Sequence, residues 1–153
     1  MIICGVLCLS LIGCGNKNIE QKAEDISTYM NKEGFETTSV KDQYEEYGYF
    51  DNADVYAAKD KDYHVEIYDI DTQSHAASFV RTNQNAFENI STEAGNAVIE
   101  TADSDEEDTY TYTTTANDKL YIVARNKDKV FFVNGANSSD EKEISKIKSS
   151  LGF

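Results

Sequence analysis

The chain has 153 residues, with 28 Asp and Glu against 14 Lys and Arg, which gives a formal net charge of −14. This excess of acid argues against a nucleic-acid partner, because phosphate binding needs clustered Lys and Arg. Hydrophobic residues make up 40% of the chain, and ten residues are Tyr, which argues equally against a disordered acidic tail. The length suffices for one domain with its own core.

The first predicted element is an apolar N-terminal segment, which reads MIICGVLCLSLIGC over residues 1–14. As a helix, residues 2–12 would reach only about 16 Å at 1.5 Å per residue. This is too short for a hydrocarbon core of ~30 Å, but it matches the central region of a signal peptide. No Lys or Arg precedes the segment, whereas a signal peptide is expected to begin with a positively charged region. A start site assigned too far downstream would explain this difference.

The segment ends in Leu11-Ile12-Gly13-Cys14, which resembles the lipobox of bacterial lipoproteins. The resemblance implies that a diacylglyceryl lipid is attached to the Cys14 thiol and that a peptidase cleaves between Gly13 and Cys14. A thiolate is a strong nucleophile for thioether formation. The alternative, a buried strand that happens to end in Cys, would not need a small residue before it. We therefore expect a signal peptide over residues 1–13, the lipidated Cys14 with a short tether over 14–18, and a single domain over 19–153.

This interpretation places the protein at the cell membrane, lipid-anchored and facing outside the cytoplasm. Two acyl chains anchor a protein stably where one is marginal. A tether over residues 15–18 spans at most about 14 Å, so that a membrane-protein partner is within reach. Cys4 and Cys8 would leave with the signal peptide, and the mature domain would hold no thiol.

The mature chain is expected to begin with a helix. Ile19, Ala23, Ile26 and Met30 recur at helical spacing, and Gly34 should end the helix. Strands are expected at 35–40, 53–58 and 63–70, the last two forming a hairpin, and residues 41–50 fit either a twisted strand or an irregular loop.

A second helix should follow, with Thr72 as its N-cap and an apolar face between Ala76 and Ile90. The strongest signal comes later, where KLYIVARNKDKVFFVN at 119–134 predicts a hairpin that is apolar on both faces and therefore central in its sheet. The remaining expected elements are strands at 97–101 and 109–115, a capping box of Ser138 with Glu141, and a last helix marked by Ile144, Ile147 and Leu151 and stopped by Gly152.

The order of these elements is helix, three strands, helix, three or four strands, helix. It predicts an α+β fold, an antiparallel sheet with about three helices packed on one face.

Some of these segments also carry a family likeness. The YDID end of the strand at 63–70, the Ala76 and Phe79 step, the hairpin at 119–134 and the closing LGF together resemble small lipoproteins of Gram-positive bacteria. The likeness covers roughly residues 63–153. It implies a cell-surface lipoprotein and assigns no catalytic residue.

Tyrosine is the residue type that most suggests binding. The chain offers no catalytic motif, so the function expected is that of a non-catalytic binding or accessory module. Tyr is amphipathic and enriched in interfaces, and a Tyr-bearing sheet face would grip a glycan, a peptide or a membrane protein. The same rings would alternatively serve cross-strand packing. The residues expected on this face are Tyr56, Tyr68, Tyr110, Tyr112 and Tyr121.

The acidic run DSDEED at 103–108 suggests a second function. Carboxylates are hard oxygen ligands for Ca²⁺, so Asp103, Asp105, Glu107 and Asp108 would form a weak Ca²⁺ site in a Ca²⁺-responsive surface module. The alternative is a solvated loop, since the run lacks the Gly and the distal Glu of an EF-hand loop.

A small hydrolase is the third alternative, and it would use one of the two histidines, His64 or His75. His64 and Glu66 should share one strand face, where they would form a metal-ligand or general-base pair, or simply a solvated pair. Two ligands do not make a transition-metal site. Apart from the lipid on Cys14 and weakly bound Ca²⁺, no cofactor is expected.

Overall fold

Strands and helices follow one another along the chain in the order that the sequence pattern suggests. A computed structural model describes residues 23–95, 98–104 and 108–153. The predictions for residues 1–18 lie outside the described residues. The elements are α1 (Ala23–Lys32), β1 (Phe35–Ser39), the 3₁₀ helix η1 (Lys41–Tyr47), β2 (Phe50–Ala58), β3 (His64–Ile70), α2 (Gln73–Ala94), β4 (Val98–Ser104), β5 (Thr109–Ala116), β6 (Lys119–Asn126), β7 (Lys129–Asn137), the 3₁₀ helix η2 (Ser138–Asp140) and α3 (Glu141–Ser150).

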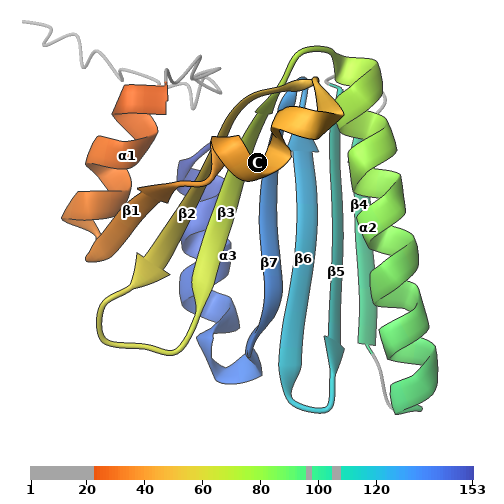
Figure 1. Cartoon of the computed structure of the whole chain (residues 1–153). Coiled ribbons are helices and arrows are strands. Elements are labelled where there is room, and N and C mark those ends of the chain that lie inside the picture. The colour runs from red at the N-terminus through yellow and green to blue at the C-terminus, as the bar shows by residue number, and fades with distance from the viewer. Residues whose placement is uncertain (1–22, 96–97, 105–107) are drawn as a thin grey trace, which may run out of the picture.

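All the strands in the described part of the chain pair in one seven-stranded antiparallel sheet, in the order β1-β2-β3-β7-β6-β5-β4 (Figure 1). The chain runs through β1, β2 and β3, passes along α2 to the far edge at β4, and returns until β7 pairs with β3. The hairpin of β6 and β7 was predicted to be central. This is confirmed, because β7 is the middle strand of the order.

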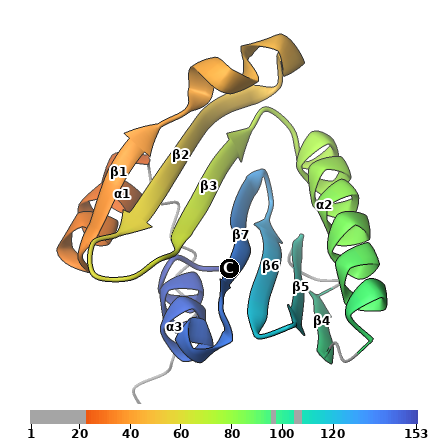
Figure 2. The same cartoon turned by 60° about the horizontal axis from the view of Figure 1, so that its bottom comes forward.

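The predicted fold class, α+β with an antiparallel sheet, is confirmed, but the packing of the helices on one face is wrong. Figure 2 shows α2 on the side of the sheet opposite to α1 and α3. The reason lies in β7, where Phe131 joins the core beneath α1 and α3 while its neighbour Phe132 joins the core beneath α2. Successive strand residues point to opposite faces, so a strand that is apolar at every position needs cover on both.

The face covered by α1 and α3, here called the α1–α3 face, holds a mainly aliphatic core. Five of the positions predicted to face the core are buried: Ile26, Met30, Ile144, Ile147 and Leu151. The prediction for Ile19 lies outside the described residues. Gly34 ends α1 with a positive φ of 94°, as predicted, because glycine adopts this conformation at no steric cost.

The opposite face, here called the α2 face, holds more aromatic side chains. Ala76, Val80 and Phe87 of α2 are buried against it. The predicted N-cap is confirmed, since the Thr72 hydroxyl accepts a hydrogen bond from the backbone N–H of His75 at 3.2 Å.

Three other expectations about local structure need correction or completion. Residues 41–47 form the 3₁₀ helix η1, so neither alternative for 41–50 holds there. β4 extends to Ser104 and so includes the start of the acidic run. The predicted capping box is wrong. The side chain of Asn137 accepts from the backbone N–H of Ser139 at 2.9 Å, and this earlier cap starts η2 before α3 begins.

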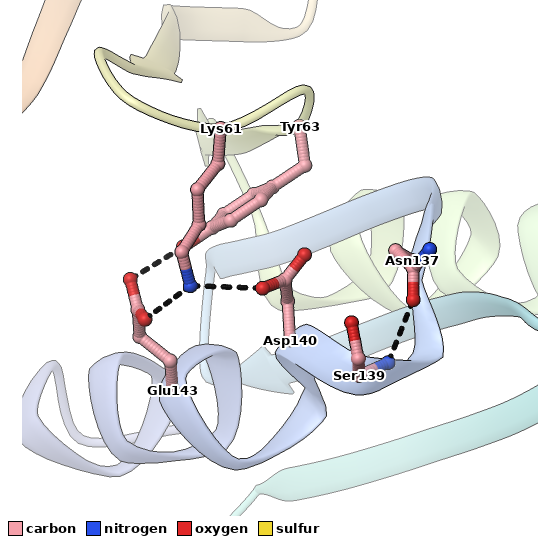
Figure 3. Close-up of polar contacts among 6 residues, drawn as sticks. All are labelled: Lys61, Tyr63, Asn137, Ser139, Asp140 and Glu143. Carbon is pink, nitrogen blue, oxygen red and sulfur yellow. Dashed lines mark hydrogen bonds and ion pairs between the residues drawn. The ribbon is translucent and has the colours of Figure 1, made fainter.

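The turn of the first hairpin is tied to the start of α3 across the α1–α3 face (Figure 3). Lys61 Nζ lies 2.8 Å from a carboxylate oxygen of Asp140 and 2.6 Å from one of Glu143. The Tyr63 hydroxyl donates to the other oxygen of Glu143 at 2.9 Å. These contacts, here called the hairpin clamp, join segments far apart in the sequence.

A candidate aromatic binding pocket

The five tyrosines predicted to form one binding face do not share a face. Tyr56 lies in the core of the α1–α3 face and is 1% exposed, whereas the other four lie on the α2 face. Of those four, Tyr68 and Tyr112 are buried, and only Tyr110 and Tyr121 are partly exposed. The prediction is wrong because pairing register decides the face: Tyr56 stands opposite Val65 in the sheet, and both point to the α1–α3 core.

Partly exposed aromatic rings gather instead where η1 meets the first turns of α2. They surround a cavity of about 320 Å³. We call this cavity the aromatic pocket. The residues that line it are Tyr44, Tyr47, Tyr49, Phe50, His75, Ser78, Phe79, Thr82 and Asn83.

Local backbone structure brings these rings together. Tyr44 and Tyr47 are three residues apart on a 3₁₀ helix, and such residues lie directly above one another because the helix has three residues per turn. Gly48 then ends the helix with a positive φ of 69°. A register shift between Phe50 and Asn52 marks the start of β2, where an irregularity can redirect a side chain.

The rings support one another through tilted and edge contacts. The ring centroid of Phe50 lies 4.7 Å from that of Tyr44 and 4.6 Å from that of Tyr49, and Phe79 meets Phe50 edge-on at 5.5 Å. These are favourable geometries for aromatic pairs. Tyr47, at the rim, keeps 53% of its surface exposed. The pocket wall is therefore held in place before any ligand arrives.

His75 forms one side of the pocket and is fixed by two contacts. Its Nδ1 lies 2.6 Å from a carboxylate oxygen of Asp71, one helical turn earlier. Its ring packs on Tyr49 at a centroid distance of 5.1 Å and an angle of 33°. The hydrogen bond with His75 holds the pKa of Asp71 below its ordinary value.

A hydrogen-bond chain leads from Tyr44, which lines the pocket, to the carboxylate of Glu66. The buried Tyr68 hydroxyl donates to Glu66, and the hydroxyls of Tyr44 and Tyr68 are 3.1 Å apart. Because the Tyr68 proton is directed to Glu66, Tyr44 donates to Tyr68. Burial, and then the bond to Glu66, raise the pKa of Tyr68. Glu66 also pairs with His64 at 3.0 Å, so the expected pair on one strand face does form.

The other candidate residues stand apart from this pocket. Asp105 and Glu107 lie outside the described residues, Asp103 belongs to β4, and Asp108 is exposed with a positive φ of 52°. Within the described ranges, no group of three or more His, Cys, Asp or Glu is placed to hold a metal ion. The Ca²⁺ site stays a prediction.

For the hydrolase alternative, the structure separates the two histidines. His75 lines the aromatic pocket together with Ser78, whereas His64 does not line it. The His75 ring is oriented by its contact with Asp71 and by its packing on Tyr49. A hydrolase that uses either histidine stays a prediction.

Sequence reasoning grouped the tyrosines by strand and so missed the pocket. The available signal was the crowding of Tyr44, Tyr47, Tyr49 and Phe50 into seven positions, in a segment that fitted no regular pattern. The partner side chains on α2, such as Phe79, are ordinary members of an amphipathic helix, and only the tertiary fold reveals that they face η1.

No family model matches the chain, and no curated protein or solved structure matches it either. None of the helices in the described part of the chain is both long enough and apolar enough to cross a membrane.

Proposed function

We propose that this protein is a lipid-anchored extracytoplasmic lipoprotein whose folded domain is a non-catalytic binding module that takes its ligand in the aromatic pocket. One observation carries the binding role. Five aromatic rings line a single cavity, and the one at its rim is 53% exposed. Ligand sites are typically concave and lined by aromatic side chains with a few polar groups. The pocket has this composition, since Ser78, Thr82 and Asn83 accompany the rings.

The size of the pocket limits what it holds. A volume of about 320 Å³ is near the lower end of ligand sites, which run from roughly 300 to 1,000 Å³. It suits a small molecule or one terminal group of a larger partner, such as a single unit of a glycan or one side chain of a peptide. A membrane-protein partner would present such a group close to the lipid anchor.

The anchor is supported by the Leu11-Ile12-Gly13-Cys14 sequence. Cys14→Ser should abolish metabolic labelling of the protein with fatty acid and leave its precursor uncleaved. Cys8→Ser is the matched control, because it removes a thiol from the same segment and should leave labelling intact. Labelling that persists in the Cys14 variant would refute the lipoprotein assignment.

The binding role is tested by capture from a cell-envelope extract. The full chain in detergent should retain an envelope component, and a Tyr47→Ala, Tyr49→Ala double variant should lose it. Tyr121→Ala is the control, because Tyr121 is a partly exposed tyrosine of the same face that does not line the pocket. If the double variant and the control retain the same components, the pocket is not the binding site.

A further inference from the structure

The surroundings of the aromatic pocket are acidic. Among the described residues that line it, none is Lys or Arg. η1 carries Asp42, Glu45 and Glu46 against the single Lys41, and all four are exposed. An excess of one charge around a concave site attracts ligands of the opposite charge and repels those of the same charge. A cation is therefore favoured over an anion.

The polar side chains on α2 point to the same conclusion. The Thr82 hydroxyl donates to the backbone carbonyl of Ser78 at 3.0 Å, and the Asn83 amide donates to that of Phe79 at 2.9 Å. Both side chains use a proton within their own helix. Thr82 therefore has only its oxygen to offer a ligand, and the carbonyl oxygen of Asn83 also stays available. These two oxygens carry partial negative charge, which suits a positive group, and the Asn83 amide keeps one further N–H.

The hydrogen-bond chain from Tyr44 to Glu66 connects a ring of the pocket to a carboxylate. Tyr44 donates to Tyr68, and Tyr68 donates to the carboxylate of Glu66. Donation towards an anion leaves the oxygen and the ring of Tyr44 more electron-rich. The face of such a ring attracts a cation through its quadrupole, and this is the means by which aromatic cages recognise quaternary ammonium groups.

We propose that the aromatic pocket binds a quaternary ammonium group, an assignment that rests on the proposed binding function and specifies its ligand class. A trimethylammonium group has a diffuse charge and an apolar shell of methyl groups, so it loses little hydration when aromatic rings surround it. A primary ammonium holds its water more strongly and needs several directed acceptors. The rings of Tyr47, Tyr49 and Phe79 supply the apolar contact, and the acidic surroundings supply the charge complementarity.

The experiment compares choline with 3,3-dimethyl-1-butanol, which has the same shape and no charge. Each is titrated into the full chain in a choline-free detergent, with the aromatic signals followed by NMR. Choline should bind at least about tenfold more tightly than the alcohol, since the quadrupole acts on charge. Tyr49→Leu should weaken choline binding about fivefold, Tyr49→Phe should preserve it within about twofold, and Tyr121→Leu should not change it.

Phosphocholine distinguishes the two sources of this group. If free choline is the ligand, the acidic surroundings should make phosphocholine bind more weakly. If phosphocholine binds more tightly and still depends on Tyr49, the ammonium belongs to a phosphorylated head group. Both results support recognition of a quaternary ammonium.

Other results separate this proposal from the general binding function. Equal binding of choline and the alcohol, or binding of methyl glucoside in their place, would overturn the ammonium assignment. If choline does not bind while the Tyr47, Tyr49 double variant still loses its envelope component, the pocket is a binding site for another ligand class. If choline does not bind and the double variant also retains its envelope component, both proposals fail.

Discussion

The two faces of the sheet are covered in different ways. On the α1–α3 face, two helices at separate positions enclose a core that includes Met30, Leu120 and Ile144, each fully buried. On the α2 face, one long helix packs mainly on β5, β6 and β7. The short η1 covers the other end, beside the start of α2 (Figure 1).

This difference explains where the aromatic pocket forms. On the α1–α3 face the two helices cover an aliphatic core, and the cavity beside them is lined, among the described residues, by no aromatic ring but by Val98, Thr113, Thr115, Ser138 and Glu141. Where cover by α2 gives way to η1, the residues between them are Tyr44, Tyr49 and Phe79, which are only partly buried. Tyr tolerates partial exposure because it buries its ring and leaves its hydroxyl in water. A face with incomplete helical cover can thus be stable and still carry a cavity.

The largest expected effect on stability comes from truncating a ring on the α1–α3 face. Phe131→Ala should lower the free energy of unfolding by about 3–5 kcal/mol, because Phe131 is completely buried and the surrounding core relaxes only partly into the cavity that is left. Phe79→Ala, at the edge of the pocket, should cost roughly half as much, since its ring is already partly exposed. Urea unfolding monitored by circular dichroism measures both.

Phe131→Leu serves as the milder variant if the Ala variant does not fold, and its cost should still exceed that of Phe79→Leu. Equal costs at the two positions would contradict this difference and mean that the two faces are packed equally tightly.

Within the α2 face, two neighbouring polar groups should respond in opposite directions. Ser91 is buried, donates to the carbonyl of Phe87 at 2.9 Å and lies 2.7 Å from the Thr114 hydroxyl. Ser91→Ala should therefore cost about 1–2 kcal/mol of unfolding free energy, since it leaves Thr114 unpaired. The buried Tyr112 hydroxyl lies close to the side chains of Ser91 and Thr114, but within the described part of the chain it makes no hydrogen bond of good geometry.

Tyr112→Phe should accordingly be neutral or stabilise the fold by up to about 1 kcal/mol, because it removes a buried polar group at constant ring volume. The same unfolding measurement decides the matter. A clear loss of stability in this variant would show that the hydroxyl has a partner.

The hairpin clamp allows a pH test on the α1–α3 face. Tyr63→Phe should cost about 1 kcal/mol of unfolding free energy, less than a buried charged hydrogen bond because the Glu143 side chain is 46% exposed. Lys61, and next Tyr63, hold the pKa of Glu143 below its ordinary value of 4.5. The stabilisation is therefore complete above about pH 4.5 and is lost as the pH falls through the lowered pKa of the folded state.

Unfolding curves of the wild type and Tyr63→Phe between pH 6 and pH 3 should therefore converge at the acid end. Tyr29→Phe is the control, since Tyr29 packs beside the same core and does not contact Glu143. A gap between wild type and Tyr63→Phe that stays constant with pH would mean that the bond to Glu143 does not stabilise the fold.

Local pattern was sufficient to predict the elements whose burial is regular. The spacing of Ile26 and Met30, and of Ile144 and Ile147, defines a helix face without reference to any other segment. The hairpin at 119–134 was equally clear, because two β-rich runs flank a short polar turn. These features depend only on residues that lie close together in the sequence.

Features that depend on register and on distant contacts could not be predicted. Whether Tyr56 or Tyr68 faces α2 is decided by the pairing of β2 with β3 and by a register shift near Phe50. The helices occupy both faces because β6 and β7 contribute apolar side chains to both cores. The pocket itself requires η1 to meet α2, as in the contact of Tyr49 with His75.

The smallest expected effect, on ligand affinity, comes from a substitution beside the aromatic pocket. Asp71 is exposed and its bond to His75 holds its pKa below the ordinary value of 3.8, so the bond is fully present at neutral pH and is lost only as the pH falls through that lowered pKa.

Asp71→Asn should leave the unfolding midpoint at pH 7 unchanged, because exposed pairs contribute little. It should nevertheless weaken binding of a pocket ligand by about twofold, since the His75 ring loses the contact that orients it against Tyr49. Titration of choline into this variant measures the loss, and Asp51→Asn, an exposed Asp that does not line the pocket, is the control. Because the aromatic pocket lies on the α2 face, a variant that changes its ligand affinity without changing stability is expected there.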